Sequence, residues 1–278
     1  MRAALVVTTY KRPDALRRVL ASVGNQTRRP DQLIVADDGS EHDDQASAIS
    51  SLRGIPGSHY LWQRDDGFRA ARLRNLALYH AETEYVVYID GDMELHPRFM
   101  EDHLRFAREG CFVQGTRARL PEGYTGRLLA RPSEEVRTRH ISMSRRKYAV
   151  RAPAIARMLA RPLRDPTRIH GCSQGFWAED LRAVNGWDEC HHGYGGEDWD
   201  LCTRLCMDGR RQVRMRFAGI AYHLWHPEHQ NWQEGGPWGV REIRSPQAED
   251  GLGLITRVAS SSVRSSRIGS CRVVHYDA

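Results

Sequence analysis

The chain opens with AALVVTTYKRPDALRRVLASV, residues 3–23, and this stretch decides the fold. Residues 3–8 form a short apolar, β-branched run that is typical of a buried strand. Pro13 then stands where a helix is expected to begin, and apolar residues follow at helical spacing: Leu16, Val19, Leu20 and Val23. A strand that passes directly into a helix is the repeating unit of α/β proteins with parallel sheets.

The same alternation continues through the first hundred residues. It predicts strands near 33–36, 60–62 and 86–89, and helices near 43–52 and 69–80. We therefore expect an α/β fold with a mostly parallel sheet flanked by helices. A glycine-rich phosphate loop does not follow the first strand, which argues against an ATPase or a simple dehydrogenase.

Polar residues follow three of these strands at the point where each strand ends. The three clusters are Thr8-Thr9-Tyr10, Asp37-Asp38-Gly39-Ser40 and Asp90-Gly91-Asp92. The carboxyl ends of parallel strands meet at one edge of a sheet, where open α/β sheets bind their ligands. Asp90 and Asp92 stand at i and i+2, so both could face one hard divalent cation. Taken alone, an Asp-Gly turn after a strand would explain the pair equally well.

A second acidic motif lies in residues 185–201, NGWDECHHGYGGEDWDL. Gly195 and Gly196 permit close approach of a ligand or a positive φ. Glu197 and Asp198 follow where a helix is expected to begin. Carboxylates in a first helical turn would also complement the helix dipole, which is the alternative explanation.

Together, these motifs resemble the nucleotide-sugar glycosyltransferases with a GT-A fold, in particular family 2 and its relatives with a galactosyltransferase-like C-terminal segment. Over about residues 1–230, three motifs match in order: VVTTYKRP at 6–13 with LIVADDGS at 33–40, DGD at 90–92, and GW at 186–187 through GGEDWD at 195–200. The resemblance implies a GT-A, Rossmann-like fold with an acceptor-side C-terminal segment.

The resemblance also implies a nucleotide and donor-sugar pocket. Its residues would be Thr8, Tyr10, Arg12, Asp37, Asp38, Arg69, Arg72, Asp90 and Gly91. Asp38, or its neighbour Asp37, would accept a hydrogen bond from the N–H of a uracil ring. The alternative for this segment is that arginines spaced along an amphipathic helix are mostly solvated. Arg74 and Asn75 are weaker candidates.

The chemistry implied is metal-dependent, inverting transfer of a hexose or N-acetylhexosamine from a UDP-sugar to a hydroxyl of a saccharide or other glycan-type acceptor. Asp198 would take the proton from the acceptor hydroxyl, and Glu197 would orient the acceptor. The residues expected to bind the acceptor are Trp187, Tyr194, Gly195 and Gly196.

The implied cofactor is Mn or Mg, held by Asp92 and a histidine. The segment AYHLWHPEH, residues 221–229, offers His223 as the first choice and His226 as the second, with His229 in a loop. Imidazole suits Mn better than Mg. A zinc site built from Cys190, His191, Cys202 and Cys206 is a minor alternative, since the spacing is not that of a known finger.

The formal net charge is +6, but only Lys11 and Lys147 among the 41 basic residues are lysines, so we expect no nucleic-acid partner. The basic surface would suit an anionic membrane face or a phosphorylated acceptor. No window is long and apolar enough for a membrane span. The expectation is a cytoplasmic protein with peripheral membrane contact as an option.

The composition changes along the chain and suggests four parts. They are a nucleotide-sugar half at 1–115, an Arg/Pro-rich insertion or lid at 116–170, an acceptor-binding and catalytic half at 171–244, and a polar, partly disordered tail at 245–278 in which residues 271–275 could form a strand. Two other functional classes remain open. One is a nucleotidyltransferase, and the other is a non-catalytic module that binds sugar nucleotides or glycans.

Overall fold

A computed structural model of the chain describes residues 1–52, 55, 57–191, 195–227, 262–268 and 271–277. The predicted site residues Tyr194 and His229 lie outside this range. In the part of the chain that is described, no helix is both long and apolar enough to cross a membrane.

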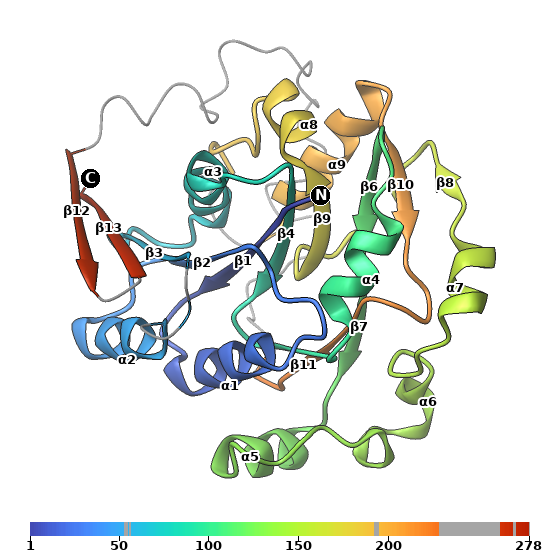
Figure 1. Ribbon diagram of the computed structural model, residues 1–278, viewed down its shortest axis with the longest axis horizontal. Coiled ribbons are helices and arrows are strands. Elements are labelled where there is room, and N and C mark those ends of the chain that lie inside the picture. Colours follow the sequence, from blue (N-terminus) through green and yellow to red (C-terminus); the bar gives the residue numbers. More distant parts are fainter. Residues whose placement is uncertain (53–54, 56, 192–194, 228–261, 269–270, 278) are drawn as a thin grey trace.

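Ten strands form the main sheet, in the order β12-β13-β3-β2-β1-β4-β9-β6-β10-β8 (Figure 1). In chain order these are β1 (Ala3–Thr9), β2 (Gln32–Asp37), β3 (Ser58–Gln63), β4 (Tyr85–Asp90), β6 (Cys111–Gln114), β8 (Pro162–Leu163), β9 (Ser173–Trp177), β10 (Arg211–Arg214), β12 (Ser262–Ile268) and β13 (Cys271–Asp277). Strands β13, β3, β2, β1 and β4 are parallel, whereas β9 is antiparallel to both of its neighbours, β4 and β6. The mostly parallel sheet predicted from the alternation is confirmed.

Helices cover both faces of this sheet. On one face lie α1 (Pro13–Gly24), α2 (His42–Leu52) and α4 (Phe99–Phe106), and on the other lie α3 (Ala70–His80), α8 (Ala178–Ala183) and α9 (Glu197–Met207). Alternate residues of β1 serve the two layers, because successive side chains of a strand point to opposite faces. Leu5 and Val7 enter the core under α1, and Ala4 and Val6 enter the core under α3.

A small second sheet has the order β5-β11-β7, with β5 (Met93–Leu95), β7 (Thr116–Arg119) and β11 (Ile220–His223). Strand β11 pairs antiparallel with β5, and His223 is opposite Met93 in the register. This pairing brings the end of β11 next to the loop that carries Asp92.

The interruption of the α/β rhythm expected at 116–170 is present as a run of short elements. After β7 come α5 (Glu122–Ala130), the 3₁₀ helix η1 (Thr138–His140), α6 (Met143–Arg146), α7 (Pro153–Leu159) and the edge strand β8. Its role as a lid and the four-part division of the chain stay predictions.

The three polar clusters share one edge of the sheet, as their positions after parallel strands predict. Thr8 of β1 is in register with Asp90 of β4, and Thr9 is in register with Asp37 of β2. The cluster at the end of β1 is therefore flanked by an acidic residue on each side.

The tail at 245–278, for which the composition predicts partial disorder, contains two strands among its described residues. Strands β12 and β13 form an antiparallel hairpin, and β13 pairs in parallel with β3 at the edge of the sheet. The strand expected at 271–275 lies within β13, which is Cys271–Asp277. Composition could not reveal this hairpin, because backbone pairing with an open sheet edge requires no long apolar run.

Candidate active site

One group of three side chains among the described residues is suited to a metal ion: Asp92, His223 and His226. Their candidate ligand atoms all lie within 4.8 Å of one another. Nε2 of His223 lies 3.6 Å from Oδ2 of Asp92, and Nε2 of His226 lies 3.4 Å from the same oxygen. The structure thus brings Asp92 next to two histidines that lie more than a hundred positions later in the sequence.

The electrostatics of this group fit a divalent cation. Oδ1 of Asp92 is buried and has no hydrogen-bond partner in the described chain. Burial, together with the nearby Asp90, raises the pKa of Asp92 to about 7. Burial, together with the positive charge of Arg117, lowers the pKa of His223 to about 3, so its imidazole is neutral and able to act as a ligand. A carboxylate with an unused oxygen beside two imidazoles is a set of donors that suits a divalent cation.

The expected zinc alternative has no support in the described residues, where no metal-competent group includes Cys190, His191, Cys202 or Cys206. Cys202 is fully buried in the core under α9, and its Sγ accepts a hydrogen bond from Gln174 at 3.4 Å.

Of the residues at the end of β1 and just after it, Arg12 contacts this metal-competent group. Nη1 of Arg12 lies 3.3 Å from Oδ2 of Asp92. Tyr10 is 46% exposed, and its hydroxyl donates to Asp65 at 3.0 Å. Oγ1 of Thr8 lies 3.3 Å from Oδ1 of Asp90. Gly91 is needed at its position, because a Cβ there would stand 2.8 Å from the carbonyl oxygen of Thr8.

The two acids that follow β2 differ in how far the protein already uses them. Asp37 is 1% exposed, and it accepts hydrogen bonds from the hydroxyl of Tyr60 and from the backbone N–H groups of Gly39 and Ser40. These contacts shape the turn after β2, and they make Asp37 the weaker candidate for binding the uracil ring of a nucleotide.

Asp38 accepts hydrogen bonds from Gln63 and from the backbone N–H of Arg69, and burial raises its pKa to about 6. The side chain of Arg69 is paired with Asp66. Arg72 is partly buried on α3.

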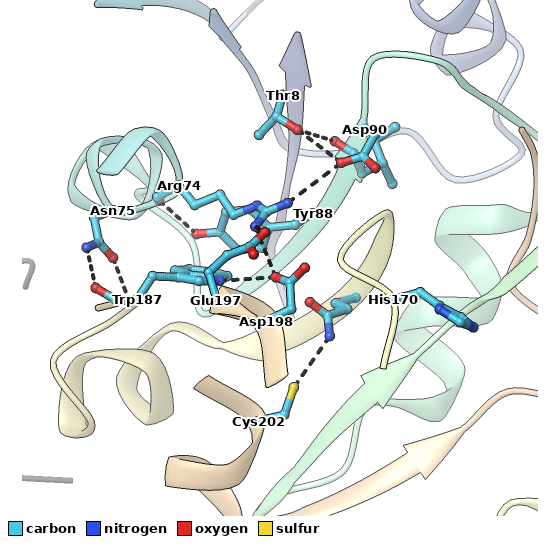
Figure 2. A network of polar contacts seen from close by, with 12 residues as sticks. Thr8, Arg74, Asn75, Tyr88, Asp90, His170, Trp187, Glu197, Asp198 and Cys202 are labelled. Atoms are coloured by element: carbon cyan, nitrogen blue, oxygen red, sulfur yellow. Dashed lines mark hydrogen bonds and ion pairs between the residues drawn. The ribbon is translucent and has the colours of Figure 1, made fainter. Parts of the chain in front are cut away.

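Arg74 of α3 joins the two acidic motifs (Figure 2). Its Nη2 lies 3.7 Å from Oδ1 of Asp90, and its Nη1 lies 3.0 Å from both Oε1 of Glu197 and Oδ1 of Asp198. The guanidinium side chain is 5% exposed. One buried cation therefore balances three carboxylates that come from β4 and from the start of α9.

The two oxygens of Asp198 have different surroundings. Oδ1 accepts hydrogen bonds from Arg74 and, at 3.3 Å, from the indole N–H of Trp187. Oδ2 faces Gly171, where a Cβ would stand 1.8 Å from it, and the side chain keeps 15% of its exposure. Burial raises the pKa of Asp198 to about 6, although Arg74 opposes the shift. One oxygen is held in place while the other can still accept a proton.

Glu197 is more enclosed than Asp198. Its side chain is 7% exposed, and its Oε2 is buried without a hydrogen-bond partner among the described residues. Gly195 and Gly196, which precede it, both have φ of 96°, as expected for glycines that bring the chain into α9.

The expected stacking of Trp187 on an acceptor sugar is wrong. The ring is completely buried and packs against Tyr88 and Phe176, with ring centroids 4.7 and 5.9 Å away. Trp187 instead positions Asp198 through its indole N–H. In contrast, Trp199 on the first turn of α9 is 50% exposed and offers an open ring.

Asn75 holds the Gly186-Trp187 turn. Its side-chain amide donates to the carbonyl oxygen of Trp187 at 2.9 Å and accepts from the backbone N–H of Trp187 at 2.9 Å. Gly186 has φ of 67°, and a Cβ there would stand 2.3 Å from Oδ1 of Asn75. The turn therefore needs both residues.

Sequence reasoning ranked Arg74 and Asn75 too low and missed Gly171. The available signal was weak, because α3 contains two arginines, Arg72 and Arg74, and only the fold shows which of them is buried. Gly171 lies in an irregular segment, and only the position of Asp198 reveals why a side chain is excluded there.

Comparisons with known proteins identify the family and the fold of this chain. A family model described as glycosyl transferase family 2 matches residues 4–176, which is more than half of the chain, and a second, described as the N-terminal domain of galactosyltransferase, matches residues 154–227. The chain is 33% identical over 102 residues to a hyaluronan synthase of Pasteurella multocida, covering 36% of this chain and 10% of that protein. It is 27% identical over 225 residues to a validoxylamine A glucosyltransferase of Streptomyces hygroscopicus subsp. limoneus, covering 74% of this chain and 48% of that protein. The chain thus spans less than half the length of these two relatives.

Solved structures with the same fold include a mannosyltransferase from Pyrobaculum calidifontis in complex with GDP-Man and Mn2+, with a TM-score of 0.57 and 17% identity, covering 80% of this chain and 56% of that one. TarS of S. aureus, residues 1–349 in complex with UDP, has a TM-score of 0.54 and 16% identity, covering 80% of this chain and 60% of that one. The structural neighbours of this chain are thus GT-A glycosyltransferases. Because the family model matches residues 4–176, the chain belongs to glycosyl transferase family 2.

Proposed function

We propose that the protein is an inverting, metal-dependent enzyme that transfers a hexose or N-acetylhexosamine from a UDP-sugar to a hydroxyl of a saccharide or glycoconjugate acceptor. The observation that carries this proposal is the placement of Asp90 and Asp198 around Arg74. The guanidinium lies 3.7 Å from the first carboxylate and 3.0 Å from the second, so the donor-side and base-side motifs share one site.

The donor would lie along the edge formed by β1, β2 and β4. Thr8 ends β1 together with Thr9, and Tyr10 and Arg12 follow it. Asp38 is the stronger of the two candidates for a uracil N–H because it accepts two hydrogen bonds where Asp37 accepts three, and it is 7% exposed where Asp37 is 1% exposed. UDP as the nucleotide is supported by the UDP complex of TarS. The GDP-Man complex of the Pyrobaculum enzyme makes GDP-sugars the necessary comparison.

A divalent cation would be held by Asp92 with His223 and His226, whose candidate donor atoms already lie within 4.8 Å of one another. When bound, such an ion stabilises the negative charge that gathers on a leaving diphosphate. The two imidazoles favour Mn over Mg. Arg12, 3.3 Å from Asp92, adds a second positive charge beside the same position.

Asp198 would accept the proton of the attacking hydroxyl through Oδ2. A base with a pKa of about 6 is largely deprotonated at neutral pH and still binds a proton during the reaction. Arg74 and Trp187 hold the other oxygen, so the lone pairs of Oδ2 have a fixed direction. Direct attack assisted by a base on the face opposite the leaving group gives inversion. Assistance of this kind is worth about 10²–10⁴-fold in rate.

The test is release of nucleotide from a panel of UDP-, GDP- and dTDP-sugars, with and without Mn2+, for the wild type, Asp92→Ala and Asp198→Asn. We expect the wild type to release UDP in a metal-dependent way. Asp92→Ala should lose this metal-dependent activity, and Asp198→Asn should still bind the nucleotide. Release of pyrophosphate from a nucleoside triphosphate would favour a nucleotidyltransferase. Tight binding of a sugar nucleotide without any turnover, across a broad set of saccharide acceptors, would favour a binding module.

A further inference from the structure

Residues 136–164, which we call the basic segment, have an unusual distribution of charge. They contain no aspartate or glutamate, and their cationic residues are Arg137, Arg139, Arg145, Arg146, Lys147, Arg151, Arg157, Arg161 and Arg164. Arg151 forms an ion pair with the buried Asp102. In the described part of the chain, no ion pair with a carboxylate is formed by Arg145, Lys147, Arg157 or Arg161. The segment therefore presents a concentrated positive charge to the solvent.

The packing of α7 is inverted relative to an ordinary surface helix. Small side chains point inward, with Ala156 at 0% and the following Ala160 at 5% exposure, whereas Met158 points outward at 70% exposure. Elsewhere in the basic segment, Ile141 is buried at 1% exposure and Met143 of α6 is 79% exposed. A helix that only had to cover the sheet would bury its larger apolar residues.

Three of the outward apolar residues share one face of a helix. In α7, Ile155, Met158 and Leu159 stand at i, i+3 and i+4 and so share one helical face, and they are 46%, 70% and 40% exposed. Val150, 49% exposed, precedes this helix, and α6 and α7 follow one another along the margin of the molecule that ends in β8 (Figure 1). Contiguous exposed apolar residues of this kind mark interaction sites.

We propose that the basic segment is a docking surface for an anionic lipid bilayer. Its charge complements the negative surface of such a bilayer, and its methionine, leucine and isoleucine side chains can enter the region between headgroups and acyl chains. Lys147 lies 5.2 Å from the ring of Tyr148, a pairing of an amphipathic ring with a cation that suits the headgroup level. Binding of this type combines two signals, charge and apolar burial.

Other occupants fit less well. A second copy of the chain would bring its own basic segment, without a compensating carboxylate, against this one. A nucleic acid or polyanionic glycan would use the arginines but would leave the apolar surface of α7 exposed to water. This proposal concerns where the protein is held, and it stands independently of the reaction proposed above.

The experiment is flotation of the full chain with vesicles of phosphatidylcholine alone or of phosphatidylcholine with about one third phosphatidylglycerol, at low and high salt. We expect binding only to the anionic vesicles, weakened by salt. Arg145→Glu with Lys147→Glu should reduce this binding at least about tenfold. The matched control, Arg17→Glu with Arg29→Glu, changes net charge by the same amount at exposed positions on and after α1, and it should stay within about twofold of the wild type.

A second pair of variants tests the apolar contribution. Met158→Gln with Leu159→Gln should reduce binding to anionic vesicles at least about fivefold, because both side chains leave the bilayer boundary. The control, Tyr79→Gln with Met207→Gln, alters apolar residues that are 55% and 57% exposed elsewhere and should have little effect. Thermal unfolding verifies that all variants remain folded.

Absence of binding to anionic vesicles would overturn the proposal. It would also be overturned if the charge-reversed and control variants bound equally. Equal binding of anionic vesicles and duplex DNA, with no effect of Met158→Gln and Leu159→Gln, would mean that the surface recognises polyanions rather than lipid.

Discussion

Nη1 of Arg74 and Oδ1 of Asp198 lie 3.0 Å apart, although 124 residues separate them in the sequence. The same guanidinium also contacts Asp90 and Glu197, so its charge compensates both acidic motifs of the candidate site. A buried cation at this position lets three carboxylates approach one another without forcing their protonation. The acid–base properties of Asp198 therefore depend on a residue of α3.

We predict that turnover depends on a group with a pKa of about 6, because burial raises the pKa of Asp198 to that value. The base must be deprotonated, so kcat/KM should rise as pH increases through about 6 and then level off. Asp198→Asn should lower kcat by about 10²–10⁴-fold and abolish this acid limb. The measurement is a pH–rate profile at saturating metal. An unchanged acid limb in Asp198→Asn would exclude Asp198 as the base.

Arg74→Gln should destabilise the protein by about 3–5 kcal/mol, because it leaves buried carboxylates without their cation. Since Arg74 holds the pKa of Asp198 down against burial, the acid limb of the profile should move to higher pH. Arg74→Lys keeps the charge and should recover part of both effects. Denaturant unfolding and the pH–rate profile are the two readouts.

The control for this variant is Arg105→Gln, which removes a 42% exposed arginine paired with Glu101 on α4. Exposed pairs of this kind are worth about 0–1 kcal/mol, so neither readout should change appreciably. A role for Arg74 that is limited to stability would appear as a loss of unfolding free energy with an unshifted acid limb.

Gly171→Ala should impair the proposed function of Asp198 as the general base, while the protein remains folded. A Cβ at this position would stand 1.8 Å from Oδ2 of Asp198, so the carboxylate must move. Displacement of a reacting group by about 1 Å can cost about 10²-fold in rate, and we expect a loss of kcat of this order. Gly126→Ala, in α5 with open space around it, is the matched control and should be silent. Nucleotide binding should be the same in both variants.

Asp92→Ala and His223→Ala should each weaken binding of Mn2+ at least about tenfold, since each removes one of the candidate ligands. Titration of Mn2+ followed by electron paramagnetic resonance measures this binding directly, without an activity assay. His42→Ala changes a histidine with a 94% exposed side chain on α2 and should leave the titration unaltered. Equal Mn2+ affinity in wild type and Asp92→Ala would place the cation elsewhere.

Trp187→Phe separates a positioning role from acceptor stacking. The variant keeps an aromatic ring in the core but loses the 3.3 Å hydrogen bond to Asp198. We expect a several-fold lower kcat, an acid limb at higher pH, and an unchanged KM for the acceptor. If the exposed ring of Trp199 contacts the acceptor, Trp199→Ala should raise that KM while leaving the acid limb in place.

The sheet and the polar edge could be predicted from the sequence because each strand of the first half is an apolar run ended by turn residues. The rule that parallel strands place their carboxyl ends together then aligns Thr8 with Asp90 and Thr9 with Asp37. The grouping of Asp92 with His223 needed the resemblance, since β11 reaches β5 across a long stretch of chain.

Other features could not be predicted, for identifiable physical reasons. A tryptophan beside glycines suits a sugar-binding surface and a core equally well, and only the packing of Trp187 on Tyr88 decides between them. Arg74 looks the same in the sequence as a solvated arginine of α3. The pairing of β13 with β3 joins segments some two hundred residues apart, and nothing in the local pattern specifies that partner.

Strand β9 fixes how the two halves of the site can move. It is bonded to β4 through five residue pairs and to β6 on its other side, so the sheet is one mechanical unit. A hinge between the part of the sheet that contains β1 and β4 and the part that contains β6 would have to break these backbone pairings. The protein therefore differs from enzymes in which two lobes close around a ligand. Substrates would therefore enter and products leave through movement of the loops at the strand ends. The backbone of β4, β9 and β6 already has its arrangement before a ligand binds.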